Sequence, residues 1–142
     1  MLNKQVRLAT VKDAIALSRL NHQFNGGEKI DPEIIKECLH AGNELVVVAV
    51  VNEQVVGFAC AQSFQTFCYP SSVGEITEMY VEETARGMGL ASSMISLLEK
   101  ELLHRGIQSI KIITGKDNDR AIKTYQKSQY LLEDVVVLEK EL

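Results

Sequence analysis

Apolar residues recur along this chain with two different spacings, and each spacing predicts one kind of element. Positions three or four residues apart predict helices that begin near residues 10, 31, 90 and 117. Alternating or continuous apolar runs predict strands at residues 5–9, 45–51, 54–64, 74–81, 109–114 and 135–138. The predicted order is β-α-α-β-β-β-α-β-α-β, an α/β (α+β) chain with a mixed sheet and helices on both of its faces.

Capping residues mark where the predicted helices start and stop. Thr10 is a good N-cap, and Asp13 stands at the capping-box position three residues later. Asp31-Pro32 places an N-cap before a proline at the first helical position, where the missing N–H is tolerated. Gly106 follows the helix predicted over 90–105 and supplies the residue type that most often ends a helix.

The composition is that of an ordinary globular protein, and it narrows the range of partners. The 142 residues are 46% apolar and 24% charged, which predicts one domain over residues 1–142 with its own core. The net charge is −4 and no run of basic residues occurs, so we expect neither nucleic acid nor a membrane as a partner. A mild negative field suits a cationic substrate, but the same charge is also ordinary for solubility.

The cysteines indicate a reducing compartment rather than a disulfide frame. Cys38, Cys60 and Cys68 are odd in number and form no Cys-x-x-Cys pair, so we expect reduced thiols and no metal site. Residues 1–7 contain no apolar leader segment, and the aliphatic run at 45–51 is too short to cross a bilayer. The expected location is the cytoplasm.

Residues 81–91, with the sequence Val-Glu-Glu-Thr-Ala-Arg-Gly-Met-Gly-Leu-Ala, join a predicted strand to a predicted helix. Gly87 and Gly89 allow the backbone to approach a bound group closely. The first turn of a helix has unpaired N–H groups that favour an anion. The segment therefore predicts a cradle for a phosphate-bearing cofactor, with a plain glycine-rich helix start as the alternative.

Two common phosphate motifs do not fit the chain. A P-loop requires Ser or Thr after Gly-Lys, but Gly115-Lys116 is followed by Asp117. A dinucleotide fingerprint requires a third glycine where this chain has Ser92. The cradle therefore predicts a different phosphate-bearing ligand.

Two carboxylates lie in the otherwise strand-like run at 74–81. Glu75 and Glu78 are costly inside a strand unless they are paired or reach a cleft. Three residues apart, they face opposite sides of the sheet unless a bulge intervenes. At most one is then expected to face a reacting group, and each is equally well interpreted as a structural, ion-paired acid.

The last predicted helix presents a mixed polar and apolar face. Asn118, Ala121, Ile122 and Tyr125 are spaced i, i+3, i+4 and i+7 and so share one side. A phenol has a reference pKa of about 10 and a thiol about 8.5, so Tyr125 is able to protonate a thiolate. The alternative is a core tyrosine whose hydroxyl is hydrogen-bonded.

Arg86, Gly89 and Ala91 fill in register the Arg/Gln-x-x-Gly-x-Gly/Ala loop of the GCN5-related N-acetyltransferase (GNAT) family, which this segment resembles. The Asn-x-x-Ala-x-x-x-Tyr pattern from Asn118 and the order of elements over nearly the whole chain resemble the family as well. The resemblance implies the GNAT (acyl-CoA N-acyltransferase) fold and direct transfer of an acetyl group from acetyl-CoA to a primary amine in a ternary complex. A non-catalytic acyl-CoA sensor or partner subunit with the same motifs is the alternative.

The same resemblance implies roles for individual residues. Glu75, six residues before Val81, is the preferred general base, Glu78 follows closely, and Tyr125 is the general acid. In the family the strand corresponding to residues 74–81 carries a bulge, its backbone bonds the pantetheine arm, and a backbone N–H there would polarise the thioester carbonyl. The implied cofactor-binding residues are Met79, Tyr80, Val81, Arg86, Gly87, Met88, Gly89, Leu90, Ala91, Asn118 and Tyr125.

The chain departs from the family at one point and leaves the acceptor open. Gln129-Tyr130 replaces the usual Gly-Phe, so we expect a differently shaped helix end. The family's pocket-forming segments correspond to residues 24–31 and 64–72, which carry aromatic and acidic side chains. They suit a small-molecule or peptide amine with an apolar body. A homodimer is possible, with residues 135–138 as an available strand edge.

Overall fold

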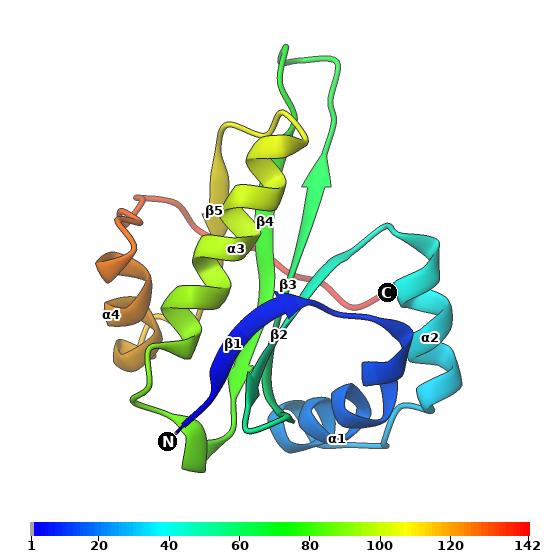
Figure 1. Ribbon diagram of the computed structural model, residues 1–142. Coiled ribbons are helices and arrows are strands. Elements are labelled where there is room, and N and C mark those ends of the chain that lie inside the picture. Colours follow the sequence, from blue (N-terminus) through cyan, green and yellow to red (C-terminus); the bar gives the residue numbers. More distant parts are fainter. Residues whose placement is uncertain (1) are drawn as a thin grey trace.

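The computed structural model describes residues 2–142, which form five strands and four α-helices (Figure 1). The strands are β1 (Lys4–Leu8), β2 (Leu45–Val51), β3 (Gln54–Phe64), β4 (Val73–Val81) and β5 (Ile110–Ile112). The helices are α1 (Ala14–Asn25), α2 (Pro32–Ala41), α3 (Leu90–His104) and α4 (Asp119–Lys127), and 3-10 turns η1 (Val11–Asp13) and η2 (Glu83–Ala85) precede α1 and α3. The strand order is β1-β2-β3-β4-β5, antiparallel except for the parallel pair β4–β5, so the predicted mixed sheet is confirmed.

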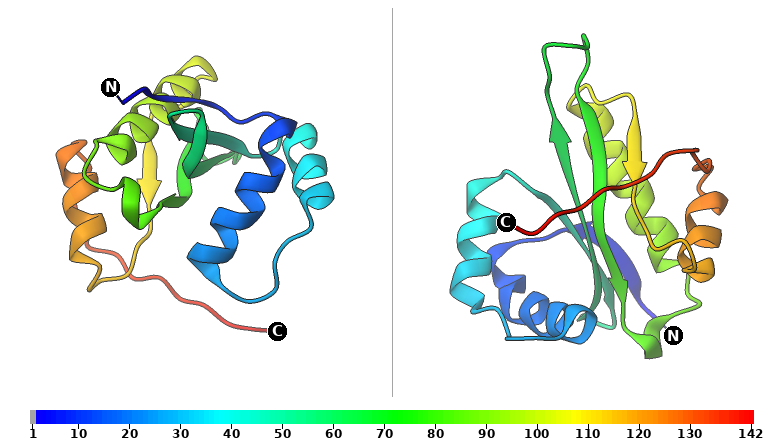
Figure 2. Two further views of the ribbon diagram at one scale, coloured as in Figure 1. Left: turned by 60° about the horizontal axis from the view of Figure 1, so that its bottom comes forward. Right: turned by 180° about the vertical axis from the view of Figure 1, so that it is seen from behind.

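Helices cover both faces of the sheet (Figures 1 and 2). On one face, Met94 and Leu98 of α3 are completely buried in a cluster with Ile76 of β4. On the other face, Leu20 of α1 is buried in a second cluster with Phe58 of β3. Side chains of β2 alternate between the two clusters, which explains why its sequence Leu-Val-Val-Val-Ala-Val-Val is apolar throughout.

The predicted helix starts are confirmed by their hydrogen bonds. The backbone N–H of Thr10 donates to the carboxylate of Asp13 at 2.8 Å, and two nitrogens of Arg7 donate to the same carboxylate at 2.8 and 3.0 Å. At α2 the carboxylate of Asp31 accepts from the N–H of Glu33 at 2.9 Å. These bonds satisfy donors that a helix start otherwise leaves unpaired.

Strand β4 contains a bulge at Thr77. Glu78 lies opposite Cys60 of β3, whereas Ile76 lies opposite Ala61, so Thr77 has no partner residue in the ladder. A bulge adds one residue to one strand and shifts the alternation of its side chains. The local residue pattern does not show this irregularity, but the family resemblance implies a bulge in this strand, and the structure has one.

The bulge brings Glu75 and Glu78 to the same face of the sheet. Glu75 lies opposite Gln62 and Glu78 opposite Cys60, and these two residues of β3 share a face because they are two apart. The simple alternation predicted opposite faces unless a bulge intervened. The extra residue Thr77 is that bulge.

Strands β4 and β5 diverge beyond their short parallel ladder. The last pair is Ile76 with Ile112, yet β4 continues to Val81. Backbone groups of residues 77–81 that point toward β5 therefore have no partner on that strand. Parallel strands that diverge in this way leave a wedge of unpaired polar backbone, which a bound group can fill.

The prediction of a strand at residues 135–138 is wrong. Residues 129–142 form neither helix nor strand, and they run from α4 across the back of the molecule toward α2 (Figure 2). The edge strand β5 is also shorter than the predicted range 109–114. The β-branched residues favour an extended conformation, but no neighbouring strand of the same chain pairs with them.

The end of α4 differs in another way from expectation. Gln129 has φ of 72°, the left-handed conformation that we expected the loss of glycine to disfavour. Tyr130 follows, and its hydroxyl donates to Glu99 of α3 at 2.9 Å, which anchors the turn. Within residues 2–142, no helix combines the length and the apolar character needed to cross a membrane.

Candidate active site

The predicted anion cradle lies between η2 and α3. Gly87 and Gly89 have φ of 82° and 76°, values that residues with a side chain rarely adopt. Gly89 is the N-cap of α3, and its carbonyl accepts the first helical bond from the N–H of Ser93 at 3.1 Å. The N–H groups of the first turn of α3 are therefore free to bind an anion, as the sequence predicted.

Contacts from two strands hold this loop in place. The ammonium of Lys4 on β1 donates to the carbonyl of Met88 at 2.9 Å. The Nε of Arg86 donates to the carbonyl of Val81 at 2.9 Å, and the guanidinium carbon lies 5.8 Å from the ring centroid of Tyr80. Arg86 thus places a positive charge between the end of β4 and the free N–H groups, an arrangement that fits a pyrophosphate.

A pocket opens where β4 and β5 diverge, and it contains most of the predicted chemistry. Its walls come from three elements and the segments next to them: β4, β5 and α4, with one side chain from α1. The lining residues are Phe24, Ile76, Thr77, Glu78, Met79, Ile112, Ile113, Thr114, Asn118, Ala121 and Tyr125. The bulged part of β4 therefore faces the polar side of α4 across this pocket.

The two titratable side chains of the pocket are suited to opposite proton transfers, one as a base and the other as an acid. Burial raises the pKa of Glu78, which makes this carboxylate a stronger base than an ordinary glutamate. Burial also raises the pKa of Tyr125, and the negative charge of Glu78 raises it further. At neutral pH Tyr125 is therefore a protonated phenol beside a carboxylate with enhanced affinity for a proton.

Glu75 has a different environment, although it lies on the same face as Glu78. Its carboxylate lies 3.6 Å from the ammonium of Lys111 on β5, and it does not line the pocket. The structure thus brings Glu78 and Tyr125 together and holds Glu75 in an ion pair. Of the two interpretations that the sequence left open for each acid, functional or structurally ion-paired, the ion-paired one therefore applies to Glu75.

The predicted shared face of α4 is largely confirmed. Asn118, Ala121 and Tyr125 line the pocket, whereas Ile122 does not. The side-chain oxygen of Asn118 accepts from the N–H of Ala121 at 3.3 Å, and its amide donates to the hydroxyl of Thr114 at 3.4 Å. Asn118 therefore caps α4 and at the same time fixes the segment that follows β5.

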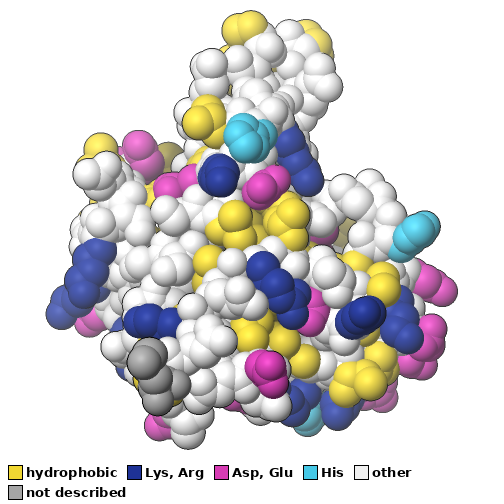
Figure 3. Space-filling view, in the orientation of Figure 1, with side chains coloured by type: hydrophobic (Ala, Val, Ile, Leu, Met, Phe, Trp, Pro, Cys, Tyr) yellow, Lys and Arg dark blue, Asp and Glu magenta, His cyan; other side chains and the backbone are white. Residues whose placement is uncertain are grey.

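Most of the aromatic residues predicted for the acceptor site do not reach this pocket. Phe67 and Tyr69 are exposed in the connection between β3 and β4, which projects from the body and carries hydrophobic side chains at its tip (Figure 3). Asp31 serves as the cap of α2. Only Phe24 lines the pocket, and its ring stacks on Tyr80 with 5.3 Å between centroids.

The sequence matches the model of the acetyltransferase (GNAT) family over residues 13–130. A relative called acetyltransferase from Yersinia pestis (strain Pestoides F) is 35% identical over 113 residues, which are 79% of this chain and 76% of the relative. The chain belongs to the GNAT family. The fold and the family that the motifs implied are thereby confirmed.

Solved GNAT structures share this architecture over almost their full length. An aminoglycoside acetyltransferase from an uncultured soil metagenomic sample, in complex with trehalose, has a TM-score of 0.87 at 18% identity, over 98% of this chain and 96% of the other. An aminoglycoside N-acetyltransferase in complex with CoA has a TM-score of 0.85 at 18% identity, over 99% and 96%. At such low identity these likenesses establish the fold alone.

Sequence reasoning missed one acid that lies near Glu78 of this GNAT site without lining the pocket. Glu44, just before β2, is near enough to Glu78 for their charges to interact: burial raises the pKa of Glu44, and Glu78 raises it further. Between them lies the buried thiol of Cys60, whose pKa is raised by burial and by both carboxylates. The sequence contains no signal for this cluster because Glu44 precedes β2, Cys60 lies on β3 and Glu78 lies on β4, so the three residues meet only through the register of these strands.

Proposed function

We propose that this GNAT chain, as a single N-acetyltransferase domain over residues 1–142, transfers the acetyl group of acetyl-CoA to a primary amine by direct attack in a ternary complex. The observation that carries the proposal is the pairing of Glu78 and Tyr125 in the wedge between β4 and β5. One group is suited to accept a proton and the other to donate one. Amine acetylation by a thioester needs both transfers.

The donor-binding part of the proposal rests on backbone groups. The N–H groups of Gly87, Gly89 and the first turn of α3, together with Arg86, would hold the pyrophosphate of CoA. The unpaired backbone of residues 79–81 on the β5 side would bind the pantetheine arm, and an N–H there would hold the carbonyl oxygen as it becomes negative. The thioester of acetyl-CoA supplies the activated acetyl group.

The acid–base part assigns one proton transfer to each side chain. Glu78 removes a proton from the acceptor ammonium, and the free amine forms the new C–N bond. Tyr125 donates its phenolic proton to the sulfur as the C–S bond breaks. A positioned acid or base of this kind contributes about 10²- to 10⁴-fold to the rate.

Our assignment of the base differs from the preference that the family resemblance gave to Glu75. Glu78 lines the pocket and has a raised pKa, whereas Glu75 is paired with Lys111. Since Glu75 does not line the pocket, it has no direct access to an amine held there. Neither Cys60 nor Cys68 lines the pocket, which supports direct transfer without a covalent acyl-enzyme.

The acceptor that suits this site is a small-molecule amine with a ring or apolar body. Phe24 and Tyr80 form a stacked pair beside the pocket, and Tyr80 is held by a 3.0 Å hydrogen bond to Gln23. Glu78 and Glu44 add negative charge that attracts an ammonium group. Aminoglycosides, the substrates named for two of the structural neighbours, belong to the class that we propose to test first.

The experiment has two steps. Calorimetric titration with acetyl-CoA, with NAD and ATP as controls, tests the cradle: micromolar binding of acetyl-CoA alone is the expected result, and no binding would overturn the proposal. A panel of small amines, aminoglycosides and peptide N-termini is then assayed by thiol release. Binding of acetyl-CoA without turnover of any amine would favour the non-catalytic sensor instead.

We also propose a cytoplasmic location. Cys38, Cys60 and Cys68 are all free thiols, and free thiols are typical of a reducing compartment. Cell fractionation followed by detection of the chain tests this, and recovery outside the cytoplasm would contradict it.

A further inference from the structure

Tyr80 lies where the two halves of the candidate site meet. It is the next-to-last residue of β4 and stands between Met79 and Val81. Met79 lines the pocket, and the carbonyl of Val81 accepts a hydrogen bond from Arg86 of the cradle. The side chain of Tyr80 contacts residues on both sides of this junction, so its role is not limited to the backbone groups of its strand.

On the acceptor side, Tyr80 holds the last turn of α1. Its ring stacks on that of Phe24 with the centroids 5.3 Å apart and the planes at 27°, and its hydroxyl donates to Gln23 at 3.0 Å. The buried ring of Phe58 on β3 completes the cluster, with its centroid 6.3 Å from each of the other two. Phe24 lines the pocket, so these contacts fix the position of one pocket wall.

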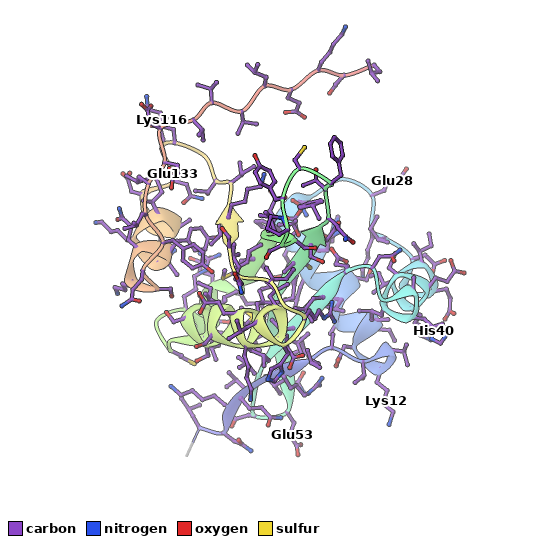
Figure 4. The ribbon with its side chains drawn as sticks, turned by 90° about the horizontal axis from the view of Figure 1, so that it is seen from above. Lys12, Glu28, His40, Glu53, Lys116 and Glu133 are labelled. Atoms are coloured by element: carbon purple, nitrogen blue, oxygen red, sulfur yellow. The ribbon has the colours of Figure 1, made fainter. Side chains whose placement is uncertain are left out.

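The connection that follows α1 gives Phe24 little further support. Residues 26–31 are all exposed, and they run over the surface from α1 to α2, with Glu28 pointing outward (Figure 4). Apart from chain neighbours, no atom of the described chain lies within 4 Å of a Cβ placed on either glycine of the pair Gly26-Gly27. The position of the Phe24 ring, which is 40% exposed, therefore depends mainly on the Tyr80 ring.

On the donor side, the same ring contacts the cation of the cradle. The guanidinium carbon of Arg86 lies 5.8 Å from the centroid of Tyr80, within the distance at which a ring attracts a cation. Among residues 2–142 the acceptor bonded to Arg86 is the carbonyl of Val81, which its Nε reaches at 2.9 Å. The terminal nitrogens of the guanidinium therefore remain for phosphate oxygens.

A separate link keeps α1 on the sheet without the help of Tyr80. Arg19 of α1 forms an ion pair with Glu82, just after β4, and also donates to the carbonyl of Val55 at 2.9 Å. Leu20 of α1 is completely buried in the cluster on this face. We therefore expect variants of Tyr80 to fold, so that a change in their ligand binding is caused by the altered side chain.

We propose that Tyr80, through its side chain, is a positioning residue for both substrates: it holds Phe24 toward the amine and Arg86 toward the pyrophosphate, and it couples the two sites. This rests on the proposed function, which places acetyl-CoA and the amine on either side of Tyr80. Because Phe24 and Arg86 contact one ring, a change at either contact alters the support of the other. Coupling between two binding sites is reciprocal, so it is measurable from either side.

The first test measures acetyl-CoA binding by calorimetry and needs no amine. Tyr80→Leu removes the ring, Tyr80→Phe removes only the hydroxyl, and Tyr69→Leu makes the first change at a 66% exposed tyrosine between β3 and β4. Tyr80→Leu should bind about two- to fivefold more weakly than wild type, the effect of one cation–ring contact. The other two variants should bind like wild type.

Two outcomes of this titration would overturn the proposal, and they are distinguishable. Wild-type affinity in Tyr80→Leu would show that the ring does not position Arg86, while acetyl-CoA binding by the chain would stand. No binding by the wild-type chain would remove the proposed function and this inference together. A lower melting temperature of Tyr80→Leu with unchanged affinity would mean that Tyr80 only packs α1 onto the sheet.

The second test examines the acceptor side with an amine that the chain acetylates. Tyr80→Leu should raise the KM for the amine about two- to tenfold, the range for one lost aromatic pair. Tyr80→Phe keeps the stack on Phe24 and should raise it less. In both variants kcat should change little, since Tyr80 touches no reacting atom. A fall in kcat with an unchanged KM would contradict a positioning role.

The third test measures the coupling itself. At saturating acetyl-CoA, Arg86→Gln should still lower kcat/KM for the amine, because the Tyr80 ring that positions Phe24 has lost its cation. In a Tyr80→Leu background the same Arg86→Gln change should have no further effect on kcat/KM. An equal effect in both backgrounds, or no effect in either, would show that Tyr80 does not connect the two sites and would overturn the proposal.

Discussion

The carboxylate of Glu78 on β4 and the phenol of Tyr125 on α4 face one pocket, and they are close enough for the charge of Glu78 to add to the effect of burial on the pKa of Tyr125. The pairing exists because the bulge at Thr77 turns Glu78 into the wedge between β4 and β5. A base and an acid on opposite walls leave room for an amine on one side and a thioester on the other. This relationship supports the first three predictions.

Replacing Glu78 with Gln should lower kcat with the best amine by about 10²- to 10⁴-fold, since the amide cannot accept the proton. The matched control is Glu75→Gln, the same change three residues away on the same face, where the carboxylate is paired with Lys111. This control should keep kcat within about tenfold of wild type. Steady-state kinetics by thiol release measures both, and the reverse ranking would move the base role to Glu75.

The pH dependence of kcat/KM should reflect the raised pKa of Glu78. A base works only when unprotonated, so activity falls as the pH drops through its pKa. Because burial raises the pKa of Glu78, this loss should begin at a higher pH than for an ordinary glutamate. Comparing the pH profiles of kcat/KM for wild type and Glu78→Gln with one amine separates the acidic decline caused by Glu78 from titration of the amine itself. An acidic decline that persists unchanged in the variant is caused by another group.

Tyr125→Phe should lower kcat by about 10²-fold or more and raise the KM for acetyl-CoA far less, because the hydroxyl acts on the leaving sulfur. Tyr130→Phe is the control: its ring lies 6.5 Å from that of Tyr125, but its hydroxyl binds Glu99 outside the pocket. The control should lose about 1 kcal/mol of stability and little activity. An unchanged kcat in Tyr125→Phe would remove this residue from the mechanism.

Gly89→Ala should weaken the binding of acetyl-CoA at least tenfold. The φ of 76° at this N-cap costs a residue with a side chain about 1–2 kcal/mol, and relief of that strain would turn the free N–H groups away. No protein atom lies within 4 Å of the added Cβ, so steric conflict inside the protein plays no part. Calorimetry of CoA binding measures the effect.

Gly106→Ala is the control for backbone strain alone. Gly106 has φ of 84°, also lacks neighbours within 4 Å of a Cβ, and lies just beyond the opposite end of α3. Both variants should melt a few degrees below wild type, since 1 kcal/mol corresponds to about 2–4 °C at this size. Only Gly89→Ala should bind CoA more weakly; equal affinity in the two would show that the cradle does not hold the ligand.

Local signals in the sequence were sufficient for most of the fold and for the cradle. The helix starts at Thr10 and Asp31 rest on hydrogen bonds between residues two or three apart, so the sequence contains all that they need. The same is true of Gly87 and Gly89, where the residue type itself permits the conformation. The shared face of Asn118, Ala121 and Tyr125 follows from helical geometry alone.

The features that the sequence did not predict depend on pairing between distant segments. The bulge at Thr77 exists only relative to β3, so only the family resemblance implied it, and the ion pair of Glu75 with Lys111 joins residues 36 positions apart. The strand expected at 135–138 has the right composition but lacks a partner within its own chain. A segment with strand propensity forms a strand only where a neighbouring strand and a packing surface are available. The local sequence does not show whether they are present.

Asp13 at the start of α1 should contribute to stability in a way that depends on pH. Burial alone would raise the pKa of this carboxyl, but hydrogen bonds from Arg7 and the Thr10 N–H outweigh burial and lower it. A folded-state pKa below the unfolded value of about 3.9 adds stability above that value, which is lost as the pH falls through the lowered folded pKa. Asp13→Asn should therefore cost about 1–3 kcal/mol at neutral pH and less near pH 2.

Asp31→Asn is the matched substitution at the start of α2. Asp31 is exposed and its side chain accepts only the N–H of Glu33, a bond that an asparagine oxygen makes equally well. Urea unfolding at pH 7 and at low pH measures both variants. We expect the stability gap between wild type and Asp13→Asn to narrow in acid while Asp31→Asn stays within about 0.5 kcal/mol of wild type. A gap for Asp13→Asn that is the same at both pH values would mean that its effect comes from packing, because only the ionised carboxylate attracts Arg7.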